Sequence, residues 1–267
     1  MDLIELLKLA ASTAIDAGVK ILEIYETGDF AIDRKTDESP LTIADKVSNS
    51  IIVSSLKHTN IPFISEESKL VDFKQRRSWN TYWLVDPLDG TKEFIKRNGE
   101  FTVNIALCHL GKPILGIIYV PVTRELYYAD ATKKMAYKSI LDEEHGLKKG
   151  LCAKEDRITK SESKKELVRI VGSRSHMNQD TLDYISSIKD EYDEVEIVSK
   201  GSSLKFCLVA EGKADVYPRF APTMEWDTAA GHAICNAVGL KVISQQTNEE
   251  LPYNKENLLN PYFLVSQ

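Results

Sequence analysis

Apolar residues recur every three or four positions in two stretches near the start of the chain. In the first stretch they are Leu3, Leu7, Ala10, Ala14, Gly18, Ile21 and Tyr25. In the second stretch, residues 42–56, they are Ile43, Val47, Ile51 and Leu56. This spacing places apolar side chains on one face of a helix, so both stretches are predicted to be amphipathic helices. Between them, residues 29–34 alternate as in a strand, and residues 36–40 have the composition of a turn.

The pattern changes to that of strands after residue 60. Short apolar runs occupy residues 61–64 and 83–85. Longer runs of strand-forming residues occupy residues 101–110, 114–120 and 125–129. Compact turns separate the longer runs, which predicts an antiparallel meander. Residues 130–165 are polar and lack apolar periodicity, so we place a boundary near residue 160, between halves of residues 1–160 and 161–267.

The second half alternates strand and helix patterns. Extended patterns occupy residues 168–171, 195–198 and 214–217. Helical patterns occupy residues 177–188, 202–211 and 228–238. Strands and helices in turn are typical of layered α/β folds. We therefore expect a mixed α/β chain whose first half is α+β.

Composition narrows the class of protein. Hydrophobic residues make up 43% of the 267 positions, which is enough for a packed core and excludes a disordered chain. With 34 basic and 40 acidic residues the net charge is −6, so the chain lacks the basic footprint of a nucleic-acid-binding protein. No apolar run approaches the ~18 residues of a membrane span, and the first residues carry acids where a signal peptide carries bases. We expect a soluble, cytoplasmic protein.

Cysteines and histidines form no metal-binding motif. The four cysteines lack a Cys-x-x-Cys pair, and three of them lie in apolar stretches where free buried thiols are expected: Cys108, Cys207 and Cys235. The five histidines are scattered, with no His-Glu-x-x-His segment. A zinc site is therefore not expected.

Residues 83–91, Trp-Leu-Val-Asp-Pro-Leu-Asp-Gly-Thr, are the most informative segment. A buried strand is predicted to end at Asp86, because Pro87 lacks the amide donor that a sheet requires. Gly90 permits a tight turn, and a helix is predicted to run from Thr91 to Ile95. Asp86, Asp89 and the carbonyl of Leu88 could then face one point, beside helix amides suited to a phosphate.

Each acidic residue also has an ordinary interpretation. Asp86 and Asp89 could be turn and cap residues, as most Asp-Pro and Asp-Gly pairs are. Asp227, at the start of a helix of small residues, could be an N-cap. However, Glu66 and Glu67 follow a further strand, so three acidic segments share the same kind of setting.

Carboxylates gathered at sheet ends repel one another unless a cation lies between them. Hard oxygen ligands select Mg²⁺, which takes a few carboxylates together with water and substrate phosphate. The residues therefore indicate Mg²⁺ and phosphoryl chemistry, although spacing alone does not establish that the segments converge.

These segments together resemble the inositol-monophosphatase superfamily of Mg²⁺-dependent, lithium-sensitive phosphatases. The superfamily pattern is Glu-Glu, then Asp-Pro-hydrophobic-Asp-Gly-Thr, then Trp-Asp-x-Ala-Ala-Gly. It stands here, in order, at residues 66–67, 86–91 and 226–231. Within the superfamily the chain is similar to the CysQ-type 3′(2′),5′-bisphosphate nucleotidases, over residues 82–107, 172–176 and 201–233. The similarity covers nearly the whole chain and is weakest over residues 130–165.

The resemblance implies a layered αβαβα sugar-phosphatase fold with its site between the halves. It implies that a first Mg²⁺ is bound by three groups: Glu66, Asp86 and the backbone carbonyl of Leu88. A second Mg²⁺ would use Asp86, Asp89 and Asp227. A third, weaker Mg²⁺ beside Glu66 would carry the attacking water, with no phosphoenzyme.

The resemblance also assigns residues that orient this water and bind substrate. Thr91 and Asp45 match the water-orienting pair, although Asp45 alone would be interpreted as a solvent-facing helix residue. The amides of Gly90 and Thr91 would hold phosphoryl oxygens, beside the metal-site residues Glu66, Leu88, Asp89 and Asp227. Contacts to the second phosphate and the base would come from Ser173, Arg174, Ser202, Lys205 and Arg219. His176 would be structural or a pocket wall. The ordinary alternative is that Lys205 and Arg219 are surface cations with no role in substrate binding.

The expected activity is hydrolysis of 3′-phosphoadenosine 5′-phosphate (PAP) to AMP and phosphate, with its sulfated form (PAPS) as a further substrate, in sulfur metabolism. The alternatives are an inositol monophosphatase, a sugar-bisphosphate phosphatase, or a metal or nucleotide sensor without turnover. Relatives at the inner membrane suggest peripheral association there, but no basic amphipathic segment supports it. The sequence leaves open whether the protein is a monomer or a homodimer, and whether it prefers PAP or PAPS.

Overall fold

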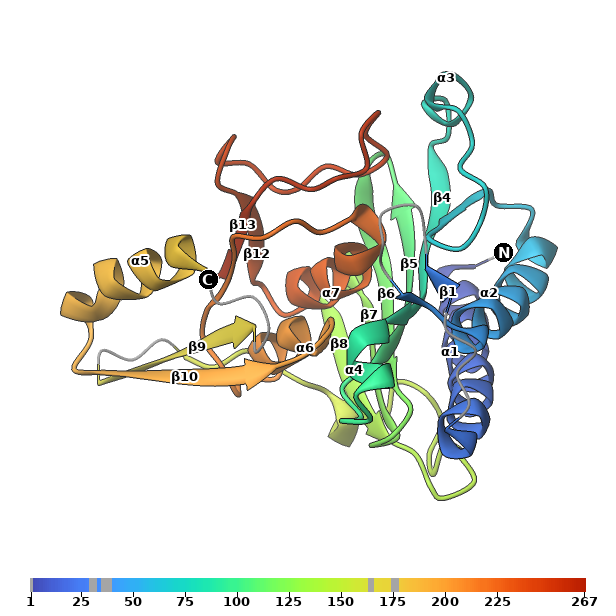
Figure 1. Cartoon of the computed structure of the whole chain (residues 1–267), viewed down its shortest axis with the longest axis horizontal. Helices are drawn as coiled ribbons and strands as arrows, with labels where there is room; N and C mark the ends of the chain where they lie inside the picture. The colour runs from blue at the N-terminus through green and yellow to red at the C-terminus, as the bar shows by residue number, and fades with distance from the viewer. Residues whose placement is uncertain (1, 29–32, 35–39, 163–165, 174–177) are drawn as a thin grey trace.

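The computed structural model describes residues 2–28, 33–34, 40–162, 166–173 and 178–267. Within these residues, layers of helix, sheet, helix, sheet and helix follow one another across the molecule (Figure 1). The layered αβαβα expectation is confirmed. Short elements outside the main layers are β1 (Asp33–Arg34), β2 (Pro40–Leu41) and α3 (Phe73–Arg76). Residues 29–32 and 36–39 of the predicted strand and turn lie outside the described residues.

Two helices form the first layer, as predicted. They are α1 (Leu3–Thr27) and α2 (Ile43–Leu56), and they pack on the larger sheet. The apolar face of α1 buries Leu7, Ala10, Ala14 and Ile21. Gly18 lies on the same face, where a Cβ would come within 2.5 Å of the Tyr119 ring. Its lack of a side chain therefore sets how closely α1 approaches the sheet.

The larger sheet contains six strands among the described residues, in the order β3-β4-β5-β6-β7-β8. Their bounds are β3 (Phe63–Ser65), β4 (Thr81–Asp89), β5 (Thr102–His109), β6 (Lys112–Val120), β7 (Glu125–Asp130) and β8 (Met135–Ile140). β3 pairs parallel with β4, and the remaining pairs are antiparallel. The predicted meander is confirmed. β8 was not expected, because it lies in the polar stretch and its edge position requires less apolar character.

Helices α6 (Leu204–Ala210) and α7 (Glu225–Ala237) form the middle layer, against the other face of the larger sheet. The contact is close, since a Cβ on Gly116 would lie 2.2 Å from the carbonyl oxygen of Ala230. Gly231 of α7 is similarly covered by the Phe206 ring, at 2.3 Å from an added Cβ. α7 begins three residues earlier than predicted, and α6 lies inside its predicted range of residues 202–211, beginning two residues later and ending one residue earlier.

The second sheet follows behind this layer. Parallel strands β9 (Leu167–Ser173) and β10 (Glu194–Lys200) pair with each other, and residue Ile170 bridges to Val216. The antiparallel strands are β11 (Tyr217–Arg219), β13 (Phe263–Ser266) and β12 (Lys241–Ser244). β9 and β10 were predicted, whereas β12 and β13 were not. The extended segment predicted at residues 214–217 occurs later, at Tyr217–Arg219.

The last layer is α5 (Gln179–Ile188), which was predicted to begin at residue 177. It packs over Val168 and Ile170 of β9, on the side of the second sheet away from α7. Cys108, Cys207 and Cys235 are buried free thiols, as expected. Within the described ranges, no helix has the length and apolar character needed to cross a membrane.

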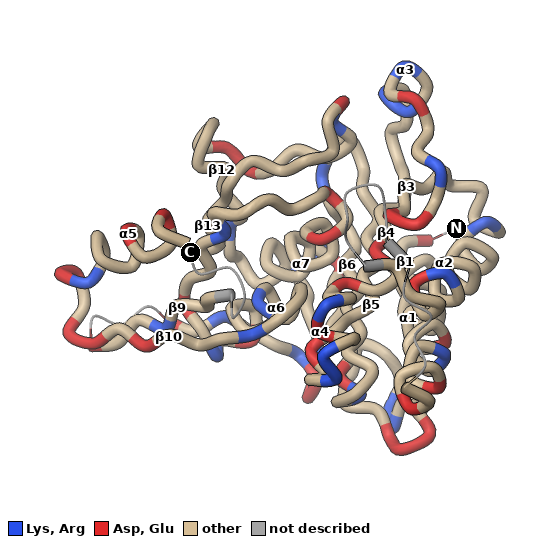
Figure 2. Tube along the Cα trace, viewed as in Figure 1, with Lys and Arg blue, Asp and Glu red and all other residues tan. Residues whose placement is uncertain are grey.

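Charge is distributed in both signs over the described part of the chain. Figure 2 shows basic segments at α4 (Thr91–Ile95) and acidic segments between α5 and β10. Interspersed charge of this kind differs from the continuous basic face expected for nucleic-acid binding.

Candidate active site

Strand β4 carries the Asp-Pro-Leu-Asp segment and does not stop where the sequence predicts. It continues through Asp86 and Pro87 to Asp89, so the predicted end at Asp86 is wrong. Asp86 pairs with Asn104 of β5 and Asp89 pairs with Thr102, which leaves one extra residue in β4. Such a bulge accommodates a proline, because the residue that is skipped by the ladder donates no bond. The carbonyl of Pro87 instead accepts from Ser48 Oγ at 2.7 Å.

Gly90 turns the chain from β4 into α4 (Thr91–Ile95), as predicted. Its φ is +92°, a left-handed value that favours glycine. A Cβ at this position would lie 3.1 Å from the Glu100 carbonyl oxygen and 3.3 Å from Ser202 Cβ. The turn therefore depends on glycine both for its backbone angle and for the approach of Ser202.

Four acidic residues from three separate stretches act on one another electrostatically. They are Glu66 after β3, Asp86 and Asp89 of β4, and Asp227 of α7. Burial raises the pKa of Asp86 well above its ordinary value, and the other three charges raise it further. Burial also raises the pKa of Asp227, with Asp89 and Glu66 adding to the effect. A cluster of this kind is stabilised when a cation offsets the repulsion.

Asp227 is not an N-cap. It is the third residue of α7, and its Oδ2 accepts from the Met224 amide at 2.8 Å, which closes a capping box. This bond holds the carboxylate at the start of the helix. Asp227 therefore helps to cap α7 as the third residue of the helix, and the same residue belongs to the acidic cluster.

The carboxylate of Asp89 is turned toward the second half of the chain. Its Oδ2 accepts from Ser202 Oγ and Ser203 N, both at 2.6 Å, and from Asn104 Nδ2 at 3.3 Å. Among the described residues, no three acidic, histidine or cysteine side chains stand together as a ready-made metal site. The donors are nonetheless carboxylate oxygens, the type that a hard divalent cation requires. These residues fit such an ion if the side chains turn toward it.

Asn104, Thr102 and Ser203 were not predicted. Thr102 Oγ1 lies 2.8 Å from Ser203 Oγ, and Ser203 Oγ donates to Asn104 Oδ1 at 2.8 Å, so the three form a buried network behind Asp89. Thr102 and Asn104 are polar residues in an otherwise apolar strand pattern. Polar residues inside this apolar pattern are the signal from which the network could have been predicted.

Asp45 and Thr91 meet, although they come from different helices. Asp45 is 1% exposed, so the solvent-facing interpretation from its helix position is wrong. Its Oδ2 accepts from both the amide and the hydroxyl of Thr42, at 2.7 and 2.6 Å. Its Oδ1 accepts from Thr91 Oγ1 at 3.2 Å. Thr91 Oγ1 also lies 3.4 Å from the carbonyl oxygen of Leu88.

Two cations lie on the other side of Asp89. Lys205 of α6 is 5% exposed, and its Nζ donates to the Ser202 carbonyl at 2.5 Å. Burial and the charge of Arg219 lower the pKa of Lys205 to about 8. Arg219 Nη2 donates to the Pro222 carbonyl at 3.2 Å, and its buried Nε has no partner within the described chain. The surface-cation interpretation is wrong for Lys205, which is buried.

The other predicted substrate contacts are only partly described. Ser173 is the last residue of β9. Arg174 and His176 lie outside the described residues.

Comparison with known proteins assigns the chain to a family. A model of the inositol monophosphatase family matches residues 2–262. The 3′(2′),5′-bisphosphate nucleotidase CysQ of Salmonella typhimurium is 44% identical over 265 residues, covering 98% of this chain and 99% of that protein. The protein of the same name from Escherichia coli K12 is 44% identical over 257 residues, covering 95% and 96%.

Solved structures agree. The crystal structure of CysQ from Bacteroides thetaiotaomicron has a TM-score of 0.86 at 50% identity, covering 98% of this chain and 97% of that chain. The Thermotoga maritima IMPase TM1415 shares the fold, with a TM-score of 0.72 at 19% identity over 98% and 92%. The chain therefore belongs to the inositol monophosphatase family.

Proposed function

We propose that the protein is a 3′(2′),5′-bisphosphate nucleotidase that hydrolyses PAP to AMP and phosphate, and PAPS as a further substrate. One observation carries the proposal: four carboxylates act on one another electrostatically, and one of them, Asp89, also acts on the buried Lys205. The cluster suits the cation and phosphoryl group of a phosphatase, and Lys205 suits a second phosphate. The names of the full-length relatives support the same substrate.

The proposed cofactor is Mg²⁺, in two sites and a third, weaker one. Glu66, Asp86 and the Leu88 carbonyl would hold the first ion, and Asp86, Asp89 and Asp227 the second. Glu66 would also hold the third. When bound, Mg²⁺ supplies charge neutralisation at the phosphoryl group and activation of water. Asp89 has to exchange its bonds to Ser202 and Ser203 for this role.

Asp45 and Thr91 are proposed to orient the attacking water. Since the Thr91 hydroxyl donates to Asp45 Oδ1, its oxygen is left to accept a proton from water. The proton can then pass from water to Thr91, while the Thr91 proton passes to Asp45. The Thr42 bonds to Oδ2 keep the Asp45 carboxylate in one orientation. Water attacks phosphorus directly, the P–O bond to the 3′-oxygen breaks, and this oxygen takes a proton from solvent to become the 3′-hydroxyl of AMP.

Substrate orientation is assigned to both sides of Asp89. The backbone amides of Gly90 and Thr91 are proposed to hold oxygens of the phosphoryl group that is transferred. The second phosphate and the base would be held by Ser173, Arg174, Ser202, Lys205 and Arg219. A cation is required here, because a buried phosphate needs charge-assisted hydrogen bonds.

A substrate panel tests the proposal. Phosphate release from PAP, PAPS, inositol 1-phosphate and fructose 1,6-bisphosphate is compared with Mg²⁺, with and without Li⁺. We expect PAP to give the highest kcat/KM and Li⁺ to inhibit. Faster turnover of inositol 1-phosphate than of PAP would reject the nucleotidase in favour of an inositol monophosphatase. Absence of Mg²⁺-dependent release from every substrate would favour a sensor without turnover.

A further inference from the structure

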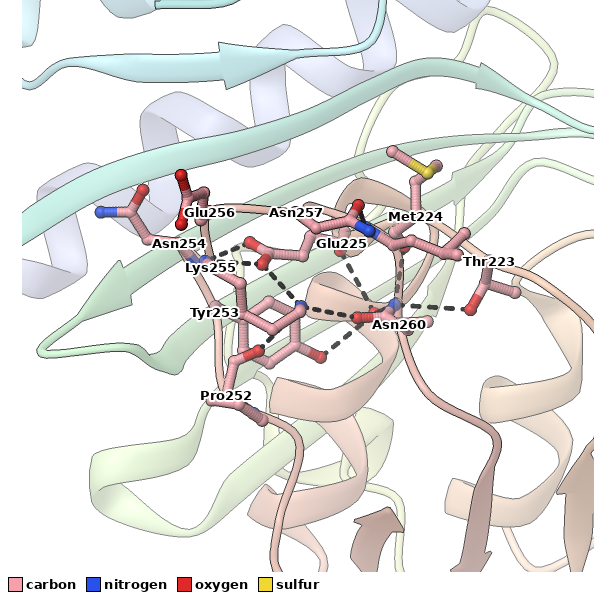
Figure 3. Close-up of polar contacts among 12 residues, drawn as sticks. Thr223, Met224, Glu225, Pro252, Tyr253, Asn254, Lys255, Glu256, Asn257 and Asn260 are labelled. Carbon is pink, nitrogen blue, oxygen red and sulfur yellow. Dashed lines mark hydrogen bonds and ion pairs between the residues drawn. The ribbon is translucent and has the colours of Figure 1, made fainter. Parts of the chain in front are cut away.

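Residues 252–260 wrap around the first turn of α7, and we call this segment the clamp (Figure 3). The amide of Glu225 donates to the Leu258 carbonyl at 3.0 Å, and the amide of Asn260 donates to the Thr223 carbonyl at 2.8 Å. Met224 and Leu259 form a further bridge between the same two segments. The clamp thus holds the backbone immediately before Asp227.

The ion pair between Glu225 and Lys255 anchors the clamp. Glu225 is fully buried, and its carboxylate accepts from the amides of Asn254 and Lys255 at 2.6 and 2.9 Å. Lys255 Nζ donates to the same carboxylate at 2.6 Å. Figure 3 shows these donors converging on Glu225. Removal of the lysine charge would leave a buried carboxylate without its cation, which is costly.

A continuous line of hydrogen bonds runs from Lys255 to Asp227. Lys255 Nζ donates to Asn260 Oδ1 at 3.1 Å, and Asn260 Nδ2 donates to the Met224 carbonyl at 2.8 Å. The Met224 amide donates to Asp227 Oδ2 at 2.8 Å. Lys255 therefore influences the Asp227 carboxylate without touching it.

The clamp also holds the chain that follows Glu66. Arg76, at the end of α3 and 3% exposed, donates to Asn254 Oδ1 at 2.7 Å and to the Glu256 carbonyl at 2.8 Å. Asn254 Nδ2 returns a bond to the Arg76 carbonyl at 2.8 Å. Lys255 stands between the two residues that bind Arg76. One short segment is thus fastened both to the first turn of α7 and to the end of α3, in the stretch of chain that follows Glu66.

We propose that the clamp, centred on Lys255, positions Asp227 for metal binding and ties it to the segment that follows Glu66. Lys255 is then a positioning residue that acts through Asn260 and Glu225. The inference rests on the proposed function, since it assumes a divalent cation at Asp227. Outer-shell partners of ligating carboxylates act in this way and change metal affinity by about 10–100-fold when removed.

The test compares Lys255→Met with Lys255→Arg in the full chain. Mn²⁺ is the probe, and its binding to metal-free protein is measured by electron paramagnetic resonance. We expect Lys255→Met to raise the Kd for Mn²⁺ about tenfold, and to raise the Mg²⁺ concentration for half-maximal hydrolysis similarly, with KM for PAP changed less than about twofold. Lys255→Arg should restore most of the affinity, because it keeps the charge. The matched control is Lys241→Met, whose exposed pair with Glu250 lies outside the clamp.

A folded Lys255→Met protein with wild-type Mn²⁺ affinity would overturn the proposal. If Lys255→Met does not fold, Asn254→Gly decides, because φ at Asn254 is +65° and glycine adopts it freely while losing the Arg76 contact. An unchanged Kd for Mn²⁺ in Asn254→Gly would then overturn the clamp proposal, and a higher Kd would support it. Wild-type protein that binds Mn²⁺ but hydrolyses no bisphosphate would reject the proposed function, while the Mn²⁺ comparison still decides the clamp. Wild-type protein that binds no Mn²⁺ would reject both.

Discussion

The two sides of the candidate site rest on different supports. On the acidic side, Asp45 lies in α2 and Asp86 lies in β4, an interior strand of the larger sheet, and both are at most 2% exposed. On the cationic side, Ser202 lies in a turn with φ of +50°, and Arg219 ends the three-residue strand β11. Asp89 joins the two through its bonds to Ser202 and Ser203. Under the proposed roles, residues of the larger sheet and of the helices packed on it carry the reaction, whereas a turn and a short strand carry the choice of substrate.

The largest effect is expected from Asp89→Asn, since Asp89 belongs to both sides. Loss of its charge should lower kcat on the order of 10³-fold, as for the loss of other groups that stabilise a charged transition state. The amide oxygen can still accept from Ser202, so the variant should stay folded. Steady-state phosphate release measures kcat, and thermal unfolding shows whether the variant is folded. Asp183→Asn, on the exposed hydrogen bond to Gln179, is the control. Near-wild-type turnover would place Asp89 outside the reaction centre.

Thr91→Val tests the acidic side alone. Without the hydroxyl between Asp45 and the Leu88 carbonyl, the water loses its proton acceptor, and kcat should fall about a hundredfold. KM for PAP should change less than about twofold, because the cationic side is intact. Thr91→Ser keeps the hydroxyl and should recover most of the rate. If kcat falls as much in Thr91→Ser as in Thr91→Val, the effect comes from packing and not from proton transfer.

Lys205→Met tests the cationic side alone. Charge-assisted hydrogen bonds contribute about 1.5–3 kcal/mol, so kcat/KM for PAP should fall about 30-fold. The same ratio for 3′-AMP, which has no second phosphate, should change little. Both are measured by phosphate release. An equal loss on the two substrates would mean that Lys205 supports the fold of α6 and does not bind the second phosphate.

The pH dependence of substrate binding gives a smaller effect on the same side. The pKa of Lys205 is lowered to about 8 by burial and by Arg219, so the residue is a cation below that pH and neutral above it. Affinity for the second phosphate is therefore present at neutral pH and lost as pH rises through 8, and KM for PAP should be roughly tenfold higher at pH 9 than at pH 7. Lys205→Arg should abolish the rise. If KM for PAP still rises with pH in Lys205→Arg, a group other than Lys205 causes the rise.

Much of the fold follows from local patterns. The spacing of apolar residues identifies α1 and the meander because these elements bury one face or both. It also identifies α2 as a helix but not its buried face, since Ala44, Ser48 and Ile52 are buried whereas Ile43 is exposed. β8 escapes because it is an edge strand in a polar stretch, whereas β12 and β13 escape because four residues are too short to show a clear periodic pattern. The course of β4 beyond Asp86 was also missed. Pro87 cannot join a regular ladder, and the bulge that accommodates it depends on pairing with β5.

The candidate site is less accessible to sequence reasoning than the fold. The resemblance supplies the residues of the acidic cluster, but spacing does not show that they meet, and their ligand roles stay predictions. The burial of Asp45 depends on how α2 packs on β4, which its own helix does not reveal. The clamp was unforeseen because the residues that it binds, Arg76 and Glu225, are far from Lys255 in sequence and unremarkable individually.

The bulge in β4 has a consequence for chain length. Side chains of a regular strand alternate between its faces, so two residues three positions apart would point in opposite directions. The extra residue pairs Asp86 and Asp89 with Asn104 and Thr102, which are two apart, and so returns both aspartates to one face. Loss of the bulge, with the three-residue interval kept, would send one carboxylate into the opposite layer. A homologue that keeps the three-residue interval should therefore keep the bulge, whereas one with a two-residue interval would need none.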